Sequence, residues 1–183
     1  MHYAIVDFLI DIAQNACEAG AGLVDIRIDE DDAGIDIAVR DDGKGMDKRE
    51  LERSIDPFVT DGLKHPGRKV GLGLPFLKQA AEQGGGRFSI VSEKGKGTEV
   101  RFRFDKGNLD CPPLGDLPGA LLSVLCMPGA REMSISRRRG SDSYELRKSE
   151  LIDALGSLDE VSSLASLKQY LLSQEEGEEL WQG

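Results

Sequence analysis

The chain has 183 residues, enough for one domain to bury a sizeable core. Its 33 acidic residues outnumber its 23 basic ones, and the net charge of −10 argues against nucleic acid or an anionic membrane as a general partner. Three cysteines without CxxC spacing predict neither a zinc site nor a disulfide framework. Because we find no membrane-spanning apolar run and no signal-peptide pattern, we expect an unexported, cytoplasmic protein.

The first predicted element is an amphipathic helix from Ile5 to Ala19, in which apolar residues recur at three- and four-residue steps. Gly20 and Gly22 end it. Two half-buried antiparallel strands follow, because apolar and polar residues alternate over 24–29 and again over 35–39.

A short helix is predicted to begin at Asp47, which forms a capping-box-like pair with Glu50. Residues 60–70 show no periodicity and predict a mobile loop, and the next helix has Pro75 at its start. A hairpin over 87–104 completes the domain. These elements predict an α/β (α+β) sandwich, with helices on one face of a mixed, mostly antiparallel sheet.

After Phe104 a linker rich in glycine and proline separates the domain at 1–105 from a C-terminal appendage at 106–183. The appendage is predicted to contain a hairpin around residues 137–140 and two helices. We expect Ser149 to cap the first helix, and Ser157 with Glu160 to form a capping box for the second. The second helix should carry one apolar side, made of Val161, Leu164, Leu167 and Leu171.

Four short motifs occur in a fixed order along the first domain. They are Asp11-Ile-Ala-Gln-Asn15-Ala-Cys-Glu18-Ala19, Asp41-Asp-Gly43-Lys-Gly45-Met46, Gly71-Leu72-Gly73-Leu74 and Gly95-Lys-Gly97-Thr98. Each alone is weak, since short glycine patterns usually mark tight turns. In this order they resemble the boxes of the GHKL (Bergerat-fold) superfamily of gyrase, heat-shock chaperone, histidine kinase and mismatch-repair ATPases. The resemblance covers residues 5–104, is closest to histidine kinases, and implies ATP and Mg²⁺ as cofactors.

On the first helix Asp11, Asn15 and Glu18 fall within a stripe of about 60° at the border of the apolar face. Mg²⁺ prefers hard oxygen ligands, and we interpret Asn15 as the metal ligand. The resemblance implies that Asp11 is the catalytic base, although the family most often has glutamate there. The alternative is that Asp11 and Glu18 are only solvated helix residues.

Asp41 has the same strand parity as the apolar residues before it, so its carboxylate should point to the buried face and be hydrogen-bonded. The resemblance implies the adenine amine as its partner, with Gly43, Gly45 and Met46 completing the box. Glycines allow backbone and base to approach closely. The alternative is a turn that caps the next helix, which is the role we expect for Asp42.

The turn Gly71-Leu72-Gly73-Leu74 leads into a helix, whose free N–H groups and dipole favour phosphate. We assign these residues to the phosphate cradle, and Lys64 of the preceding loop to an ATP lid. The cradle departs from the family's usual Gly-Thr-Gly-Leu-Gly-Leu. Phe58 is expected to pack beneath the lid, and Thr98 to belong to the last box of the site, where a simple hairpin turn explains the neighbouring glycines almost as well.

These features favour a standalone histidine-kinase-like or anti-sigma-factor-like kinase or ATPase, which transfers or hydrolyses the γ-phosphate of ATP with a protein partner. We find no dimerisation helices carrying a phosphorylatable histidine, so the phosphoacceptor should lie on another chain. The alternative is a non-catalytic regulatory module that senses ATP or ADP. A clamp ATPase is disfavoured because no transducer domain is recognisable. A homodimer is a further possibility.

Overall fold

The computed structural model describes residues 4–58 and 73–176, which form one six-stranded sheet in the order β3-β4-β2-β1-β5-β6. The strands are β1 (Leu23–Glu30), β2 (Gly34–Asp41), β3 (Arg87–Glu93), β4 (Gly97–Asp105), β5 (Glu132–Arg139) and β6 (Asp142–Arg147). Only β1 and β5 are parallel neighbours; the other adjacent pairs are antiparallel. The predicted fold class is confirmed.

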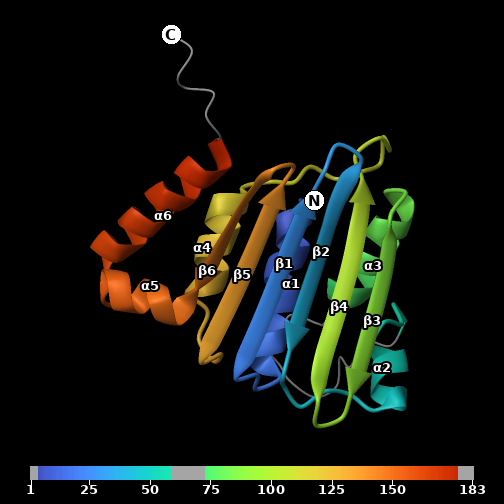
Figure 1. Cartoon of the computed structure of the whole chain (residues 1–183). Coiled ribbons are helices and arrows are strands. Elements are labelled where there is room, and N and C mark those ends of the chain that lie inside the picture. Colours follow the sequence, from blue (N-terminus) through green and yellow to red (C-terminus); the bar gives the residue numbers. More distant parts are fainter. Residues whose placement is uncertain (1–3, 59–72, 177–183) are drawn as a thin grey trace.

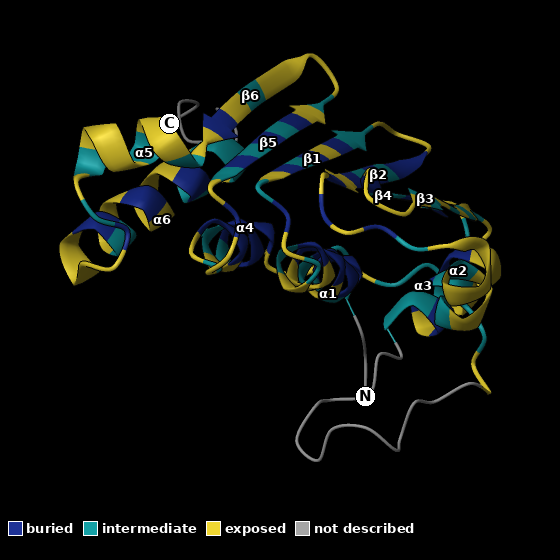
Figure 2. Ribbon diagram, turned by 90° about the horizontal axis from the view of Figure 1, so that it is seen from below, coloured by how far each residue is buried: buried dark blue, intermediate teal, exposed yellow. Residues whose placement is uncertain are grey.

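The helices are α1 (Ile5–Glu18), α2 (Lys48–Ser54), α3 (Gly73–Gln83), α4 (Leu117–Leu125), α5 (Lys148–Leu155) and α6 (Val161–Glu176). Figure 1 shows the sheet in front of α1, α3 and α4, and Figure 2 shows these helices together on one side of it. Within residues 4–58 and 73–176, no helix is both long and apolar enough to cross a bilayer.

The core lies between this helical layer and the inner face of the sheet. α1 occupies the centre of the layer because its predicted apolar face is buried, with Leu9 fully buried and Phe8 stacked on Phe104 of β4 at 6.2 Å between ring centroids. From β2 and β4, Ile37 and Phe102 project into the same core. This packing fixes the side of α1 that remains at the core's edge, where Asn15 lies.

The C-terminal segment joins the same sheet. β5 pairs with β1 along its length, from Leu23 opposite Glu132 to Glu30 opposite Arg139, and β6 pairs with β5. Strands from both sides of residue 105 therefore share one sheet, which the sequence did not indicate. The domain boundary near residue 105 stays a prediction.

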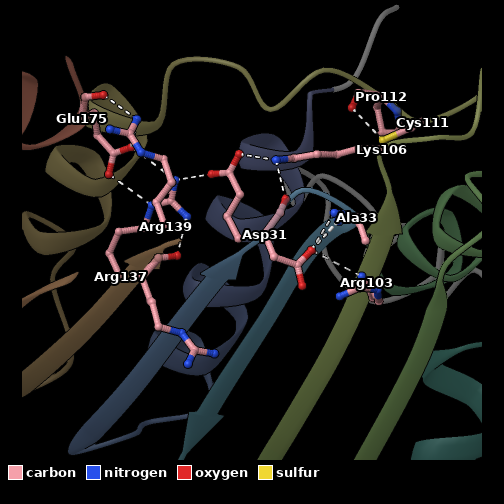
Figure 3. A network of polar contacts seen from close by, with 12 residues as sticks. Asp31, Ala33, Arg103, Lys106, Cys111, Pro112, Arg137, Arg139 and Glu175 are labelled. Carbon is pink, nitrogen blue, oxygen red and sulfur yellow. Dashed lines mark hydrogen bonds and ion pairs between the residues drawn. The ribbon is translucent and has the colours of Figure 1, made fainter. Parts of the chain in front are cut away.

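A buried ionic cluster ties α6 to this extension of the sheet (Figure 3). Arg137 points inward from β5, with its side chain 2% exposed, and pairs with Glu175 of α6 (Nε to Oε1, 3.1 Å) and with Glu30 of β1. Tyr144 of β6 donates its hydroxyl to the same Glu175 oxygen at 2.7 Å. Every charge in the cluster thus has a partner of opposite sign.

Three local expectations are wrong for the C-terminal helices. Ser149 lies inside the first turn of α5, which has Arg147 at its N-cap and no side-chain cap. Ser157 does not cap α6: its Oγ accepts from the N–H of Asp159 at 3.1 Å, and the helix begins only at Val161. Val161 itself is 83% exposed, whereas Leu167 and Leu171 of the predicted apolar side are buried.

Phe58 is also placed differently from the prediction. Its side chain is 92% exposed, whereas the sequence predicted a packed position. By contrast, the capping box at α2 is confirmed: the N–H of Glu50 donates to the carboxylate of Asp47, and the N–H of Asp47 donates to that of Glu50, both at 2.9 Å.

Candidate functional site

A cavity of about 280 Å³ lies between α1, the start of α3 and the ends of β2, β3 and β4. Residues from all four sequence motifs line it together. The predicted site residues in its lining are Asn15, Asp41, Gly45, Met46, Leu74 and Thr98. Residues up to 83 positions apart in the chain therefore meet at one place, as the order of the motifs predicted.

Asp41 ends β2 with its carboxylate toward this cavity, and its side chain is buried as its strand parity predicted, at 9% exposure. Its Oδ1 accepts the N–H of Gly43 at 2.8 Å. Among the described residues no cation lies within ion-pair distance of Asp41. Burial raises the pKa of Asp41, and the backbone N–H groups of Gly43 and Thr98 oppose that rise. The cavity thus contains a buried carboxylate whose described partners are backbone N–H groups and not a cation.

The loop after Asp41 can take its course only because glycine occupies two positions. A β-carbon at Gly43 would lie 2.8 Å from Oδ1 of Asp41, and one at Gly45, where φ is +57°, would lie 2.0 Å from the carbonyl oxygen of Glu93. The loop is fixed between α1 and the β3–β4 turn, since the N–H of Lys44 donates to Ala19 and its carbonyl accepts from Gly95. These glycines let the backbone wrap closely around the Asp41 carboxylate.

Ser92 is a residue of this site that the sequence reasoning missed. Its Oγ accepts the N–H of Met46 at 2.8 Å and lies 2.8 Å from Oγ1 of Thr98. It therefore holds the Asp41 to Met46 loop against β3 and β4. The available signal was parity: Ser92 follows Phe88 and Ile90 at the inward positions of β3, where a polar side chain needs a partner.

The polar stripe of α1 lies along the cavity. Asn15 and Glu18 line it, and both are exposed, with Glu18 accepting a hydrogen bond from Gln14 at 3.0 Å. Asp11 is not in the lining, but it adjoins the start of α3, since a β-carbon at Gly73 would lie 3.4 Å from its Oδ2. The predicted base and the predicted phosphate turn are therefore neighbours.

The remaining predicted site residues, Lys64, Gly71 and Leu72, and the predicted lid at 60–70 lie outside the described residues.

The cavity is also lined by residues that the sequence did not predict. Two of them are polar, Lys44 and Ser54. The others form apolar walls: Ile12, Ala16, Val39, Ile90 and Val100. Apolar walls around a few polar groups are typical of a small-molecule site.

A larger hollow, of about 780 Å³, lies on the opposite, helix-free face of the described sheet. Charged side chains such as Arg27, Asp29 and Arg101 line it, and it contains none of the described residues predicted for the site. Many of these side chains pair with one another, as Arg27 does with Asp25 at 3.1 Å. The lining of the larger hollow is mostly charged, whereas the smaller cavity has mostly apolar walls around a few polar groups, and we therefore take the smaller cavity as the candidate site.

Similarity to known proteins points to the same region. Residues 3–108 match the family described as "Histidine kinase-, DNA gyrase B-, and HSP90-like ATPase". The chain is 32% identical over 96 residues to the sensor histidine kinase ZraS of Escherichia coli, which covers 51% of this chain and 20% of ZraS. It is 34% identical over 99 residues to sporulation kinase A of Bacillus subtilis, covering 53% and 16%. The match thus spans a fifth or less of these relatives' length.

A solved structure, the catalytic domain of histidine kinase ThkA, is also similar, with 22% identity and a TM-score of 0.42 over 55% of this chain and 65% of that one. The family match covers more than half of this chain and contains every residue that lines the candidate cavity. The chain therefore belongs to the family of histidine kinase-, DNA gyrase B- and HSP90-like ATPases.

Proposed function

We propose that this protein binds ATP with Mg²⁺ in the 280 Å³ cavity and, as a kinase or ATPase, transfers or hydrolyses the γ-phosphate with a protein partner. The observation that carries the proposal is Asp41, a buried carboxylate that faces an apolar-walled cavity with no cation in reach among the described residues. Leaving such a group without a counter-ion costs free energy. A ligand that donates a hydrogen bond, as the adenine amine does, would offset that cost.

The residues present fit a magnesium ion that is held mainly by phosphate. Among residues 4–58 and 73–176 no cluster of three or more metal-ligating side chains of His, Cys, Asp or Glu occurs. Mg²⁺ bound with a nucleotide needs only one or two protein oxygens, and Asn15 offers such an oxygen, with Glu18 one turn further on. When bound, the ion would neutralise charge on the phosphates, while Asn15 would orient it relative to α1.

Asp11 is proposed as the general base, because it lies one turn from Asn15 and beside Gly73. The first N–H groups of α3 are the proposed phosphate donors, so a nucleophile near the γ-phosphate would lie within reach of the Asp11 carboxylate. Positioning and electrostatics would supply most of the rate enhancement, as is usual in phosphoryl transfer.

One feature favours the second candidate, a regulatory module that binds ATP or ADP without turnover. The side chain of Asp11 is one methylene shorter than the glutamate that the family usually has at this position, which shortens its reach to a nucleophile. In that case the nucleotide would serve as a signal, and the protein partner would respond to the bound state. The phosphoacceptor, a homodimer and the cytoplasmic location all stay predictions from the sequence alone.

Measuring ATP turnover separates the two candidates. For the enzyme, we expect Asp11→Asn to keep its affinity for MgATP but to lose roughly 100-fold or more in turnover, the usual share of a general base. Asp11→Glu should preserve or raise the rate. Asn15→Ala serves as a third variant, since it should weaken Mg²⁺-dependent triphosphate binding more than adenosine binding.

The regulatory module predicts a different result in the same experiment. Wild-type protein would bind MgATP, yet show no hydrolysis and no transfer to candidate protein partners, and both Asp11 variants would leave that unchanged. Equal losses of adenosine and MgATP affinity in Asn15→Ala would remove the metal assignment and leave Asn15 a structural role.

A further inference from the structure

Asp42, the residue after the proposed adenine ligand, clamps the turn between α1 and β1. Its Oδ1 accepts the N–H groups of Gly22 at 2.7 Å and Leu23 at 2.8 Å, and its own N–H donates to the carbonyl of Leu23 at 3.3 Å. The expectation that Asp42 caps the next helix is therefore wrong, since Asp47 caps α2. The backbone bond from Leu23, with that from Gly22, lowers the pKa of Asp42, so the carboxylate is ionised at neutral pH.

The same turn is fixed to the C-terminal segment. The carbonyl oxygen of Gly22 accepts the N–H groups of Arg131 and Glu132, both at 3.0 Å, at the point where β5 begins. Gly22 and Leu23 thus lie between the Asp42 carboxylate on one side and the start of β5 on the other. The end of β2 is connected to β5 through two peptide groups.

This clamp determines how the end of β2 is held. Asp41 lies opposite Val24 of β1 and opposite Thr98 of β4, so both neighbouring strands position it. On the β4 side, Thr98 is fixed through Ser92. On the β1 side, Asp42 supplies the corresponding restraint, although it does not line the cavity.

We propose that Asp42 is a positioning residue for adenine recognition, which fixes the Asp41 carboxylate by clamping Gly22 and Leu23 and, through Gly22, connects it to β5. The inference rests on the proposed nucleotide function. Through this connection, the segment beyond residue 105 helps to hold the site in place. The orientation of Asp41 then depends on two charge-assisted backbone bonds that lie outside the cavity.

The chain contains a matched control in Asp31. Its Oδ1 likewise accepts two backbone N–H groups, from Ala33 at 2.9 Å and Gly34 at 2.7 Å, and it is exposed like Asp42. It lies in the β1–β2 turn, at the opposite end of the same strand pair from Asp41. Replacing either residue by alanine removes two backbone hydrogen bonds to a carboxylate, and Asp31→Ala also removes a 3.7 Å ion pair with Arg103, but only Asp42 is next to the proposed site.

The experiment compares Asp42→Ala, Asp42→Asn and Asp31→Ala in the full chain, with MgADP as the calorimetric ligand and Gly43 amide hydrogen exchange as a second readout. We expect Asp42→Ala to bind MgADP about tenfold more weakly, because without these charge-assisted bonds part of the binding free energy must be used to order the Asp41 carboxylate. Asp42→Asn should stay within about threefold, because its amide oxygen can accept both N–H groups. Asp31→Ala should lower the unfolding temperature without weakening MgADP binding.

Exchange of the Gly43 amide, which donates to Asp41, should accelerate in Asp42→Ala and not in Asp31→Ala. Unchanged affinity in Asp42→Ala, or an equal loss in Asp31→Ala, would overturn the proposal. If wild-type protein binds no MgADP, the proposed function fails, and the Gly43 exchange alone decides whether Asp42 positions Asp41. Equal exchange in all three variants would then reject the positioning role.

Discussion

Two charged side chains are buried in the described part of the molecule, and their surroundings are opposite. Arg137, 2% exposed, ends among Glu30, Glu175 and the hydroxyl of Tyr144, so that its charge is fully matched within the protein. Asp41, 9% exposed, has no cation within ion-pair distance in the described residues and faces a cavity. A charge that the protein matches itself serves the fold. A charge that it leaves unmatched at a cavity is available to a ligand.

The two regions also differ in what a substitution should change. Loss of Arg137 leaves two largely buried carboxylates short of a cation, and this appears as lost stability. Loss of the Asp41 charge removes a desolvation cost from the free protein. It also deprives the ligand of a charged hydrogen-bond acceptor. Substitutions at Arg137 should therefore change stability, whereas substitutions at Asp41 should change nucleotide affinity.

The largest expected effect is on the Arg137 cluster. Replacing Arg137 by methionine should lower the free energy of unfolding by about 3 kcal/mol, the low end of the range for removing one partner of a buried ion pair, because Lys106 still pairs with Glu30 and Arg139 with Glu175. Arg138→Met is the matched control, because Arg138 pairs with Asp29 on the exposed face and its side chain is 64% exposed; its loss should cost less than about 1 kcal/mol. Denaturant unfolding measures both, and equal costs would show that the cluster is not what stabilises this end of the sheet.

A smaller effect is expected at Tyr144. Tyr144→Phe removes the hydroxyl that donates to Glu175 at 2.7 Å, while Arg137 and Arg139 still contact that carboxylate. We expect a loss of about 1 kcal/mol in unfolding free energy and no change in nucleotide binding. Tyr170, which is 43% exposed, provides the control: Tyr170→Phe should change neither quantity. A nucleotide-binding defect in Tyr144→Phe would contradict the view that the Arg137 cluster affects stability only.

The smallest effect concerns the pH dependence of stability. Because burial raises the folded-state pKa of Asp41 above its usual 3.8, the stability linked to its protonation is fully present below that value and is lost as the pH rises through the folded pKa. Asp41→Asn lacks this loss. Its unfolding temperature relative to wild type should therefore increase between pH 4.5 and pH 7.5, by at most a few degrees. A relative decrease over the same range would mean that ionised Asp41 stabilises the free protein.

Local patterns in the sequence predicted much of this architecture. Strand parity placed Asp41 on the buried face, and the pair of Asp47 and Glu50 marked the start of α2. The spacing of apolar residues identified the buried face of α1, and hence the border on which Asn15 lies. Each of these features depends on residues within one turn or one strand, where period and capping chemistry determine the structure.

The features that the sequence did not reveal depend on distant contacts. Arg137 looked like part of a basic turn, and its partners Glu30 and Glu175 lie 107 and 38 residues away. The placement of β5 beside β1 was equally hidden, because no local pattern specifies a parallel neighbour. Phe58 was misplaced because phenylalanine is most often buried, but this one is exposed.

The central claim is that Asp41 receives the adenine of a nucleotide, and calorimetric titration of wild type and Asp41→Asn with MgADP tests it most directly. We predict that wild type binds and that the variant loses about 1.5 to 3 kcal/mol of binding free energy, roughly 10- to 150-fold in affinity, because the amide cannot replace a charged acceptor. The variant should unfold at no lower a temperature than wild type at neutral pH, which separates lost binding from lost folding. Unchanged MgADP affinity in a folded Asp41→Asn protein would contradict the account.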